Sequence, residues 1–153
     1  MSKPAWVGTW ESPNDRRSRV EKSMTDLLGN GKEIAGLVEA EAMASGVPVT
    51  VCVMDIHGNV ILKHRMNGAP AFSIEIAERK AYTCALIGMR TADLLPLVQP
   101  GQELFSLSFL AGGRFVAMGG GVPLADGGKV FAGVGVSGGT AGQDVAIDRK
   151  SVV

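Results

Sequence analysis

Four side chains near the middle of the chain have the types that bind iron or move protons: His64, Arg65, Met66 and Lys80. An imidazole exchanges protons near neutral pH and also ligates haem iron, and a thioether is a second soft ligand for that iron. Arginine and lysine hold carboxylates and oxyanions. The four residues therefore predict one of two sites: a haem pocket, or an acid/base site for a small anion.

Each of these residues also has an ordinary structural explanation. His64 can be a hydrogen-bonded core histidine, and Met66 can fill a gap in the core. Lys80 either extends its amine from a buried helical stripe to solvent or binds an anionic group. His57, the other histidine of the chain, is most simply a turn residue. The sequence has no histidine and carboxylate spacing typical of a closed zinc site.

The glycines of the last third form two motifs. Gly119, Gly120 and Gly121 exclude side chains, either because of a bulge or turn or because a ligand contacts the backbone. Residues 133–138 match the pattern G-x-G-x-x-G, but only 15 residues follow Gly138. A dinucleotide fold needs a helix, a further parallel strand and an acidic residue after this motif, so nucleotide binding is not predicted.

The elements expected to position His64 are two strands, 47–54 and 60–66, joined by a turn at 55–59. Strand alternation places His64 on the apolar face with Leu62, and Arg65 on the opposite face. Closing the turn at His57 and Gly58 gives two expected pairs: Asp55 with Val60, and Val51 with His64.

Helical patterns surround this hairpin, and strands follow it. We expect helices over 32–45 and 73–86, ended by Gly46 and Gly88, and a short helix from Thr91. Three further strands are expected at 107–111, 114–118 and 129–136. Tight turns favour antiparallel pairing, so the prediction is an α/β (α+β) sandwich with one five-stranded antiparallel sheet flanked by helices.

Composition supports a single soluble domain. The chain has 153 residues, 46% hydrophobic and 20% charged, and its formal net charge is +0, which disfavours disorder and nucleic-acid binding. We expect an N-terminal arm at 1–22, carrying Trp6 and Trp10, followed by one domain at 23–153.

No signal peptide or membrane span is evident, so a cytoplasmic protein is expected. Cys52 and Cys84 are expected to be buried, reduced thiols.

Six segments in order resemble one known family, and they lie at 46–59, 65–70, 73–77, 79–83, 119–123 and 135–139. They read GVPV with VMDIHGN, RMNGAP, SIEIA, RKAYT, GGGVP and GVSGG. Together they resemble the GlcG/HbpS family, also called haem-degrading and related to the C-terminal domain of PduO-type proteins. The resemblance runs from about Thr25 to Asp144, which is most of the chain.

This resemblance implies a profilin-like fold, homo-oligomers and the binding of haem or a related tetrapyrrole, in a family often found in catabolic operons. Our leading hypothesis is a ligand-binding protein whose pocket is formed by residues 64–70, the start of the second helix and residues 119–123. His64 or Met66 would ligate the iron, and Arg65 and Lys80 would bind the propionates. The sequence departs from the family at His64, where a hydrophobic residue is usual, in its arm, and in a last helix that stops at Val153.

An enzyme without a cofactor is the alternative hypothesis. It would be a tautomerase, hydrolase or lyase acting on a small organic acid or carbonyl compound. His64 would transfer the proton, Arg65 or Lys80 would hold the anion, and Glu75 or Asp144 would orient the base. A purely structural role is a third possibility, but no residue specifically indicates it.

Overall fold

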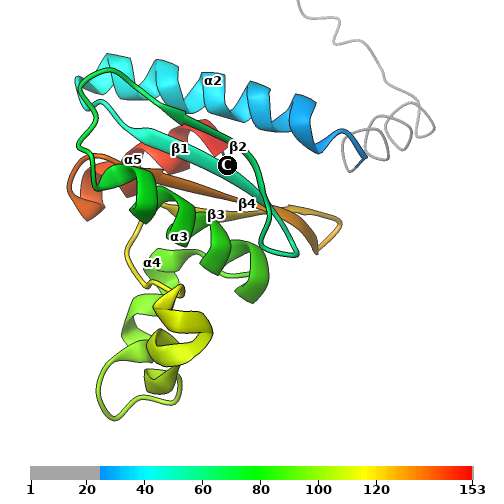
Figure 1. The fold of residues 1–153 in the computed structure, drawn as a ribbon, viewed down its shortest axis with the longest axis vertical. Helices are drawn as coiled ribbons and strands as arrows, with labels where there is room; N and C mark the ends of the chain where they lie inside the picture. Colours follow the sequence, from blue (N-terminus) through cyan, green and yellow to red (C-terminus); the bar gives the residue numbers. More distant parts are fainter. Residues whose placement is uncertain (1–24, 153) are drawn as a thin grey trace, which may run out of the picture.

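A computed structural model describes residues 25–152, which form a sheet covered by helices on both faces (Figure 1). Helices α2 and α5 cover one face, and α3 covers the other. The bounds are Leu27–Ser45 for α2, Ser73–Ile87 for α3 and Ala141–Val152 for α5. The expected α+β class with helices flanking one antiparallel sheet is confirmed. The arm at 1–22, with Trp6 and Trp10, lies outside the described residues.

The sheet of the described residues has four strands rather than the expected five. They are β1 (Thr50–Asp55), β2 (Val60–Arg65), β3 (Gly121–Asp126) and β4 (Lys129–Ser137). Their order is β2-β1-β4-β3, and every neighbouring pair is antiparallel. The two central strands, β1 and β4, carry most of the buried strand positions because helices cover them on both faces.

The expected strands at 107–111 and 114–118 were wrong. Residues Phe105–Gly113 form 3-10 turns, called η2, and 114–118 is irregular. A short apolar run does not distinguish a strand from a helical turn. Here the chain kinks at Ala111 and Gly112, which have φ of 50° and 64°. Strand β3 instead begins within the triple glycine, at Gly121.

The helix ends follow local chemistry. The Asp26 carboxylate caps α2 by accepting the Gly29 N–H at 2.9 Å, and Gly46 and Gly88 end α2 and α3 in the left-handed conformation. Helix α2 begins earlier than the expected residue 32 and includes Gly29, Asn30 and Gly31. Ser73 is the first residue of α3, and its hydroxyl donates to the Pro70 carbonyl.

The register of the β1–β2 hairpin is confirmed at one expected pair and corrected at the other. Val51 lies opposite His64, as expected. A bulge near Met54 shifts the pairing, so Val60 faces Met54 rather than Asp55. The Asp55 carboxylate instead organises the turn by accepting two backbone N–H groups, from His57 and Asn59.

Two apolar clusters hold the layers together. The larger joins α2 and α5 to the sheet, and the smaller joins α3 to the opposite face. Helix α3 lies very close to β4 at Gly135. A Cβ added to Gly135 would lie only 1.9 Å from the Ala77 carbonyl oxygen of α3. Only glycine permits this approach.

A segment between α3 and β3 extends away from the sheet (Figure 1). It contains α4 (Thr91–Leu94), η1 (Leu95–Val98) and η2. Several of its apolar side chains are exposed, and Phe109 is 71% exposed. Among residues 25–152, no helix is long and apolar enough to cross a membrane.

Candidate functional site: an exposed histidine and a buried ion pair

His64 lies on the edge strand β2 and pairs with a carboxylate of α2. Its Nδ1 is 2.7 Å from Oε1 of Glu39, and the two side chains are 49% and 33% exposed. Strand alternation directs His64 toward the face that α2 covers, as expected. A carboxylate at Nδ1 fixes the tautomer with the proton on that nitrogen and leaves Nε2 as the acceptor. The imidazole therefore presents a free nitrogen at the rim of the molecule.

Arg65 and Met66, the two residues that follow His64, make contacts that support the fold. Arg65 donates two hydrogen bonds to the Ala69 carbonyl, from Nε at 3.1 Å and Nη2 at 2.7 Å. These bonds close the turn that leads to α3. The Met66 sulfur accepts the Val49 N–H at 3.5 Å, and its side chain packs against the larger core. Met66 is thus engaged in packing on the face that α2 covers.

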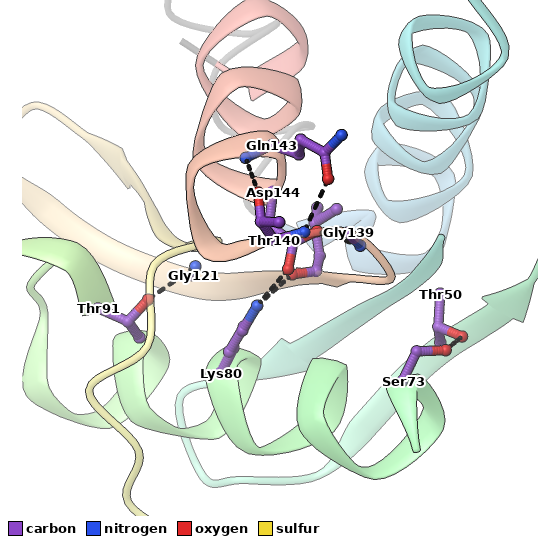
Figure 2. A network of polar contacts seen from close by, with 10 residues as sticks. Thr50, Ser73, Lys80, Thr91, Gly121, Gly139, Thr140, Gln143 and Asp144 are labelled. Atoms are coloured by element: carbon purple, nitrogen blue, oxygen red, sulfur yellow. Dashed lines mark hydrogen bonds and ion pairs between the residues drawn. The ribbon is translucent and has the colours of Figure 1, made fainter. Parts of the chain in front are cut away.

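Lys80 is the largest fully buried side chain of the described residues. It extends from α3, and its Nζ donates to Oδ2 of Asp144 on α5 and to the Val136 carbonyl of β4, both at 2.8 Å. Figure 2 shows the amine between helices that cover opposite faces of the sheet. The other Asp144 oxygen accepts the Gly139 N–H at 2.9 Å. Burial lowers the pKa of Lys80, and its bond to Asp144 opposes that shift.

The triple glycine packs around this ion pair. A Cβ on Gly120, whose φ is 118°, would lie 2.5 Å from the Val136 carbonyl oxygen and 2.9 Å from Nζ of Lys80. A Cβ on Gly119 would lie 2.4 Å from Val145. The Gly121 N–H donates to Thr91 Oγ1 at 2.8 Å (Figure 2). Protein atoms therefore occupy the space where side chains would otherwise be.

A second ion pair lies next to the first, and sequence reasoning missed it. Nη2 of Arg90 is 2.5 Å from Oδ1 of Asp148, whose side chain is 2% exposed. Burial raises the pKa of Asp148 to about 6, although Arg90, Arg149 and Lys80 act against this shift. Asp148 follows Asp144 by four residues on α5, so the buried helical face that places Asp144 also indicates Asp148. Glu39 had no such signal, because it is 25 residues from His64.

The structure thus separates the predicted residues into groups. Lys80, Asp144 and the glycines 119–121 come together at one end of the sheet. His64, Arg65 and Met66 lie on or just after the edge strand β2. Glu75 is exposed and pairs with Arg79 on its own helix at 2.5 Å.

The potential metal-binding side chains of the described residues form no cluster. Within residues 25–152, no three histidine, cysteine, aspartate or glutamate side chains are close enough to hold a metal ion together. Cys52 and Cys84 are buried free thiols, as expected, and burial raises the pKa of each to about 12. A haem, which needs only one or two axial ligands, does not require such a cluster.

The molecule is a helix–sheet–helix domain with a carboxylate-bound histidine on its edge strand and a buried lysine–aspartate pair inside. Residues 29–152 match the model of a family described as haem degrading protein HbpS-like, and the chain belongs to that family. The expected GlcG/HbpS membership is confirmed.

Relatives of similar size support this assignment. An uncharacterized 15.0 kDa protein of Citrobacter freundii, encoded between dhaT and dhaS, is 39% identical over 127 residues, which cover 83% of this chain and 89% of that protein. The crystal structure of Klebsiella pneumoniae protein ORFY has a TM-score of 0.78 at 34% identity, covering 82% of this chain and 86% of that one. A structure titled as a PduOC:heme complex has a TM-score of 0.76 at 33% identity, covering 79% and 88%.

Proposed function

We propose that this protein binds haem or a related tetrapyrrole. The observation that carries the proposal is the likeness to PduOC, whose crystal structure is that of a haem complex and which is 33% identical over most of this chain. The family description, haem degrading protein HbpS-like, points to the same ligand class. This chain carries a histidine at position 64, on the exposed edge strand.

His64 is the residue that we propose as the axial ligand. Histidines that bind metals usually donate their other ring N–H to a carboxylate, which orients the ring and raises the basicity of the ligating nitrogen. Glu39 lies in that relation to Nδ1 of His64, and the half-exposed imidazole needs no rearrangement of the core to reach a ligand. When bound, haem would supply a redox-active iron. The residues around His64 fit such a group on donor chemistry.

The cations assigned to the propionates differ in their availability. Lys80 is 2% exposed and bound to Asp144, so a propionate would have to break a buried ion pair to reach it. Arg65 is exposed and uses Nε and Nη2 on the Ala69 carbonyl. Its Nη1 remains for an anion. We therefore propose Arg65 rather than Lys80 for this role. Because Arg65 and His64 project from opposite faces of β2, the propionate would reach Arg65 around the unpaired edge of that strand.

A haemin titration followed by Soret absorbance tests the proposal. We expect saturable binding by the full chain, and His64→Ala should abolish the spectrum of an imidazole-ligated iron. His57→Ala is the matched control, because His57 is the other histidine and lies in an exposed turn. Glu39→Gln should weaken binding by roughly 10-fold or more, as loss of an outer partner of a metal ligand does.

Two results would count against this assignment. Non-saturable binding would remove the haem function altogether. Saturable binding that His64→Ala and His57→Ala leave equally intact would keep the ligand but reject His64 as its donor.

The same histidine–carboxylate pair favours a second candidate, an enzyme without a cofactor. A histidine whose Nδ1 is held by a carboxylate is the usual arrangement for a general base. Glu39 takes the orienting role in this candidate, in place of Glu75, which pairs with Arg79, and Asp144, which pairs with Lys80. Screening small organic acids and carbonyl compounds for turnover that His64→Ala abolishes and His57→Ala preserves would support it.

We also propose that the chain forms homo-oligomers through the segment that extends from the sheet. Phe105, Phe109 and Leu110 are exposed on it, and the rings of Phe105 and Phe109 pack edge to face at 5.7 Å. The η2 turns contain no charged residue and bury none of their side chains. An uncharged apolar surface of this kind fits a copy of itself, as in homodimer interfaces. Phe109→Ser should lower the mass measured by light scattering, whereas the exposed helix residue Met43→Ser should not.

A further inference from the structure

A groove with a volume of about 470 Å³ lies away from His64, between α2, α5 and the outer part of the sheet. Its apolar wall comes from four elements: Ile34 of α2, Val122 and Leu124 of β3, Phe131 of β4, and Val152 of α5. The charged residues in its lining are Arg90 and Glu33. The volume falls within the range of small-molecule pockets, about 300–1,000 Å³.

Arg90 is held in this groove by its buried partner. Asp148 accepts from Nη2 alone, and this is the one interaction that the Arg90 side chain makes among the described residues. Its Nε and Nη1 donors are therefore left for another group. The Arg90 side chain is 22% exposed, which keeps it within reach of a ligand. A guanidinium that is fixed in place binds a carboxylate at a lower cost in side-chain entropy than a free one.

The charges of the lining limit the ligand class. A single arginine whose Nε and Nη1 donors are unused can donate hydrogen bonds to one carboxylate. Glu33 is exposed on α2 and would repel a second negative group, so dicarboxylates and polyphosphates fit poorly. The apolar wall favours a hydrocarbon body.

We propose that this groove binds a small apolar monocarboxylate, with its carboxylate on Arg90 and its hydrocarbon part against Val122, Leu124 and Phe131. The site is separate from His64 and does not depend on haem. It gives the protein a second ligand class, independent of the tetrapyrrole proposed above.

Calorimetric titration of the full chain with hexanoate, 1-hexanol and hexylamine tests this inference. We expect saturable binding of hexanoate, and binding at least about tenfold weaker for the other two, because only hexanoate pairs with Arg90. Arg90→Gln should weaken hexanoate binding by a similar factor.

Because Arg90→Gln also removes the partner of Asp148, a second variant keeps the test independent of folding. Ala125 is exposed on β3 and lines the groove, so Ala125→Phe fills it without changing the ion pair, and Ala125→Ser is the matched control. We expect Ala125→Phe to weaken hexanoate binding and Ala125→Ser to preserve it. Equal binding of hexanol, hexanoate binding that Ala125→Phe leaves unchanged, or no saturation up to about 10 mM would overturn the proposal. Haemin binding of the Ala125 variants should match the parent chain, which separates this site from His64.

Discussion

Two pairs of side chains in this molecule have similar lengths and different environments. Lys80 and Asp144 are 2.8 Å apart and almost fully buried, whereas His64 and Glu39 are 2.7 Å apart and partly exposed. The first pair joins helices on opposite faces of the sheet. The second joins an edge strand to the helix above it. Similar distances therefore say little about the role of a pair until burial is considered.

The difference follows from desolvation. A charge transferred from water into the protein interior costs several kcal/mol, so both partners of a buried pair must be present. An exposed pair keeps much of its hydration and contributes little to stability. The buried pair is thus a structural feature of the fold, and the exposed pair is available to a ligand.

The largest effect is expected at the buried pair. Lys80→Met leaves the Asp144 carboxylate buried without its cation, and this should lower the free energy of unfolding by about 3–5 kcal/mol. Urea denaturation measures the change. The double variant Lys80→Met with Asp144→Leu should recover part of that loss, because it removes the unpaired charge. A double variant less stable than the single one would contradict this account.

Buried and exposed glycines should differ in the same way when a side chain is added. Gly135→Ala places a Cβ 1.9 Å from the Ala77 carbonyl oxygen, so α3 must move, and we expect a loss of about 3 kcal/mol. Gly36→Ala is the matched control on the exposed part of α2, where no atom lies within 4 Å of the added carbon. It should stabilise the protein by about 0.5–1 kcal/mol. Thermal unfolding of the two variants compares them directly.

Asp148 gives the stability of the buried region a pH dependence. Its pKa is raised from 3.8 to about 6, so its neutral form favours folding below pH 4, and that contribution is lost as pH rises through 6. The stability of the parent chain relative to Asp148→Asn should therefore fall by about 2 kcal/mol between pH 4 and pH 7. Urea titrations of both proteins at several pH values measure the difference. A constant difference would show that Asp148 does not titrate in this range.

The smallest effect on stability is expected at the exposed pair. His64→Ala should change the free energy of unfolding by less than about 1 kcal/mol, because the interaction between His64 and Glu39 is partly exposed to solvent. The same variant should nevertheless lose haem ligation. A large loss of stability would show that His64 is part of the fold, and would weaken its assignment as a ligand.

Several features of the fold followed from local sequence. Gly46 and Gly88 ended the helices where expected, and the alternation of 60–66 placed His64 and Arg65 on the correct faces. The segment 107–111 was wrongly expected to be a strand, because its apolar run lacks a period that distinguishes the two states. The triple glycine was expected to exclude side chains, because of either a bulge or turn or a ligand against the backbone. The protein atoms that surround it came only from the structure.

The sequence alone determined the family, the helix–sheet architecture and the residue types available for chemistry, because these depend on periodicity, on turn residues and on motif order. Tertiary structure decided which residues meet. It paired His64 with Glu39 across 25 residues and Lys80 with Asp144 across 64. It also decided which of the two pairs is buried. Burial in turn decides whether a cation is held within the fold or is available to a ligand. The physical reason is that burial depends on how helices from distant parts of the chain cover the sheet, and no local pattern encodes that arrangement.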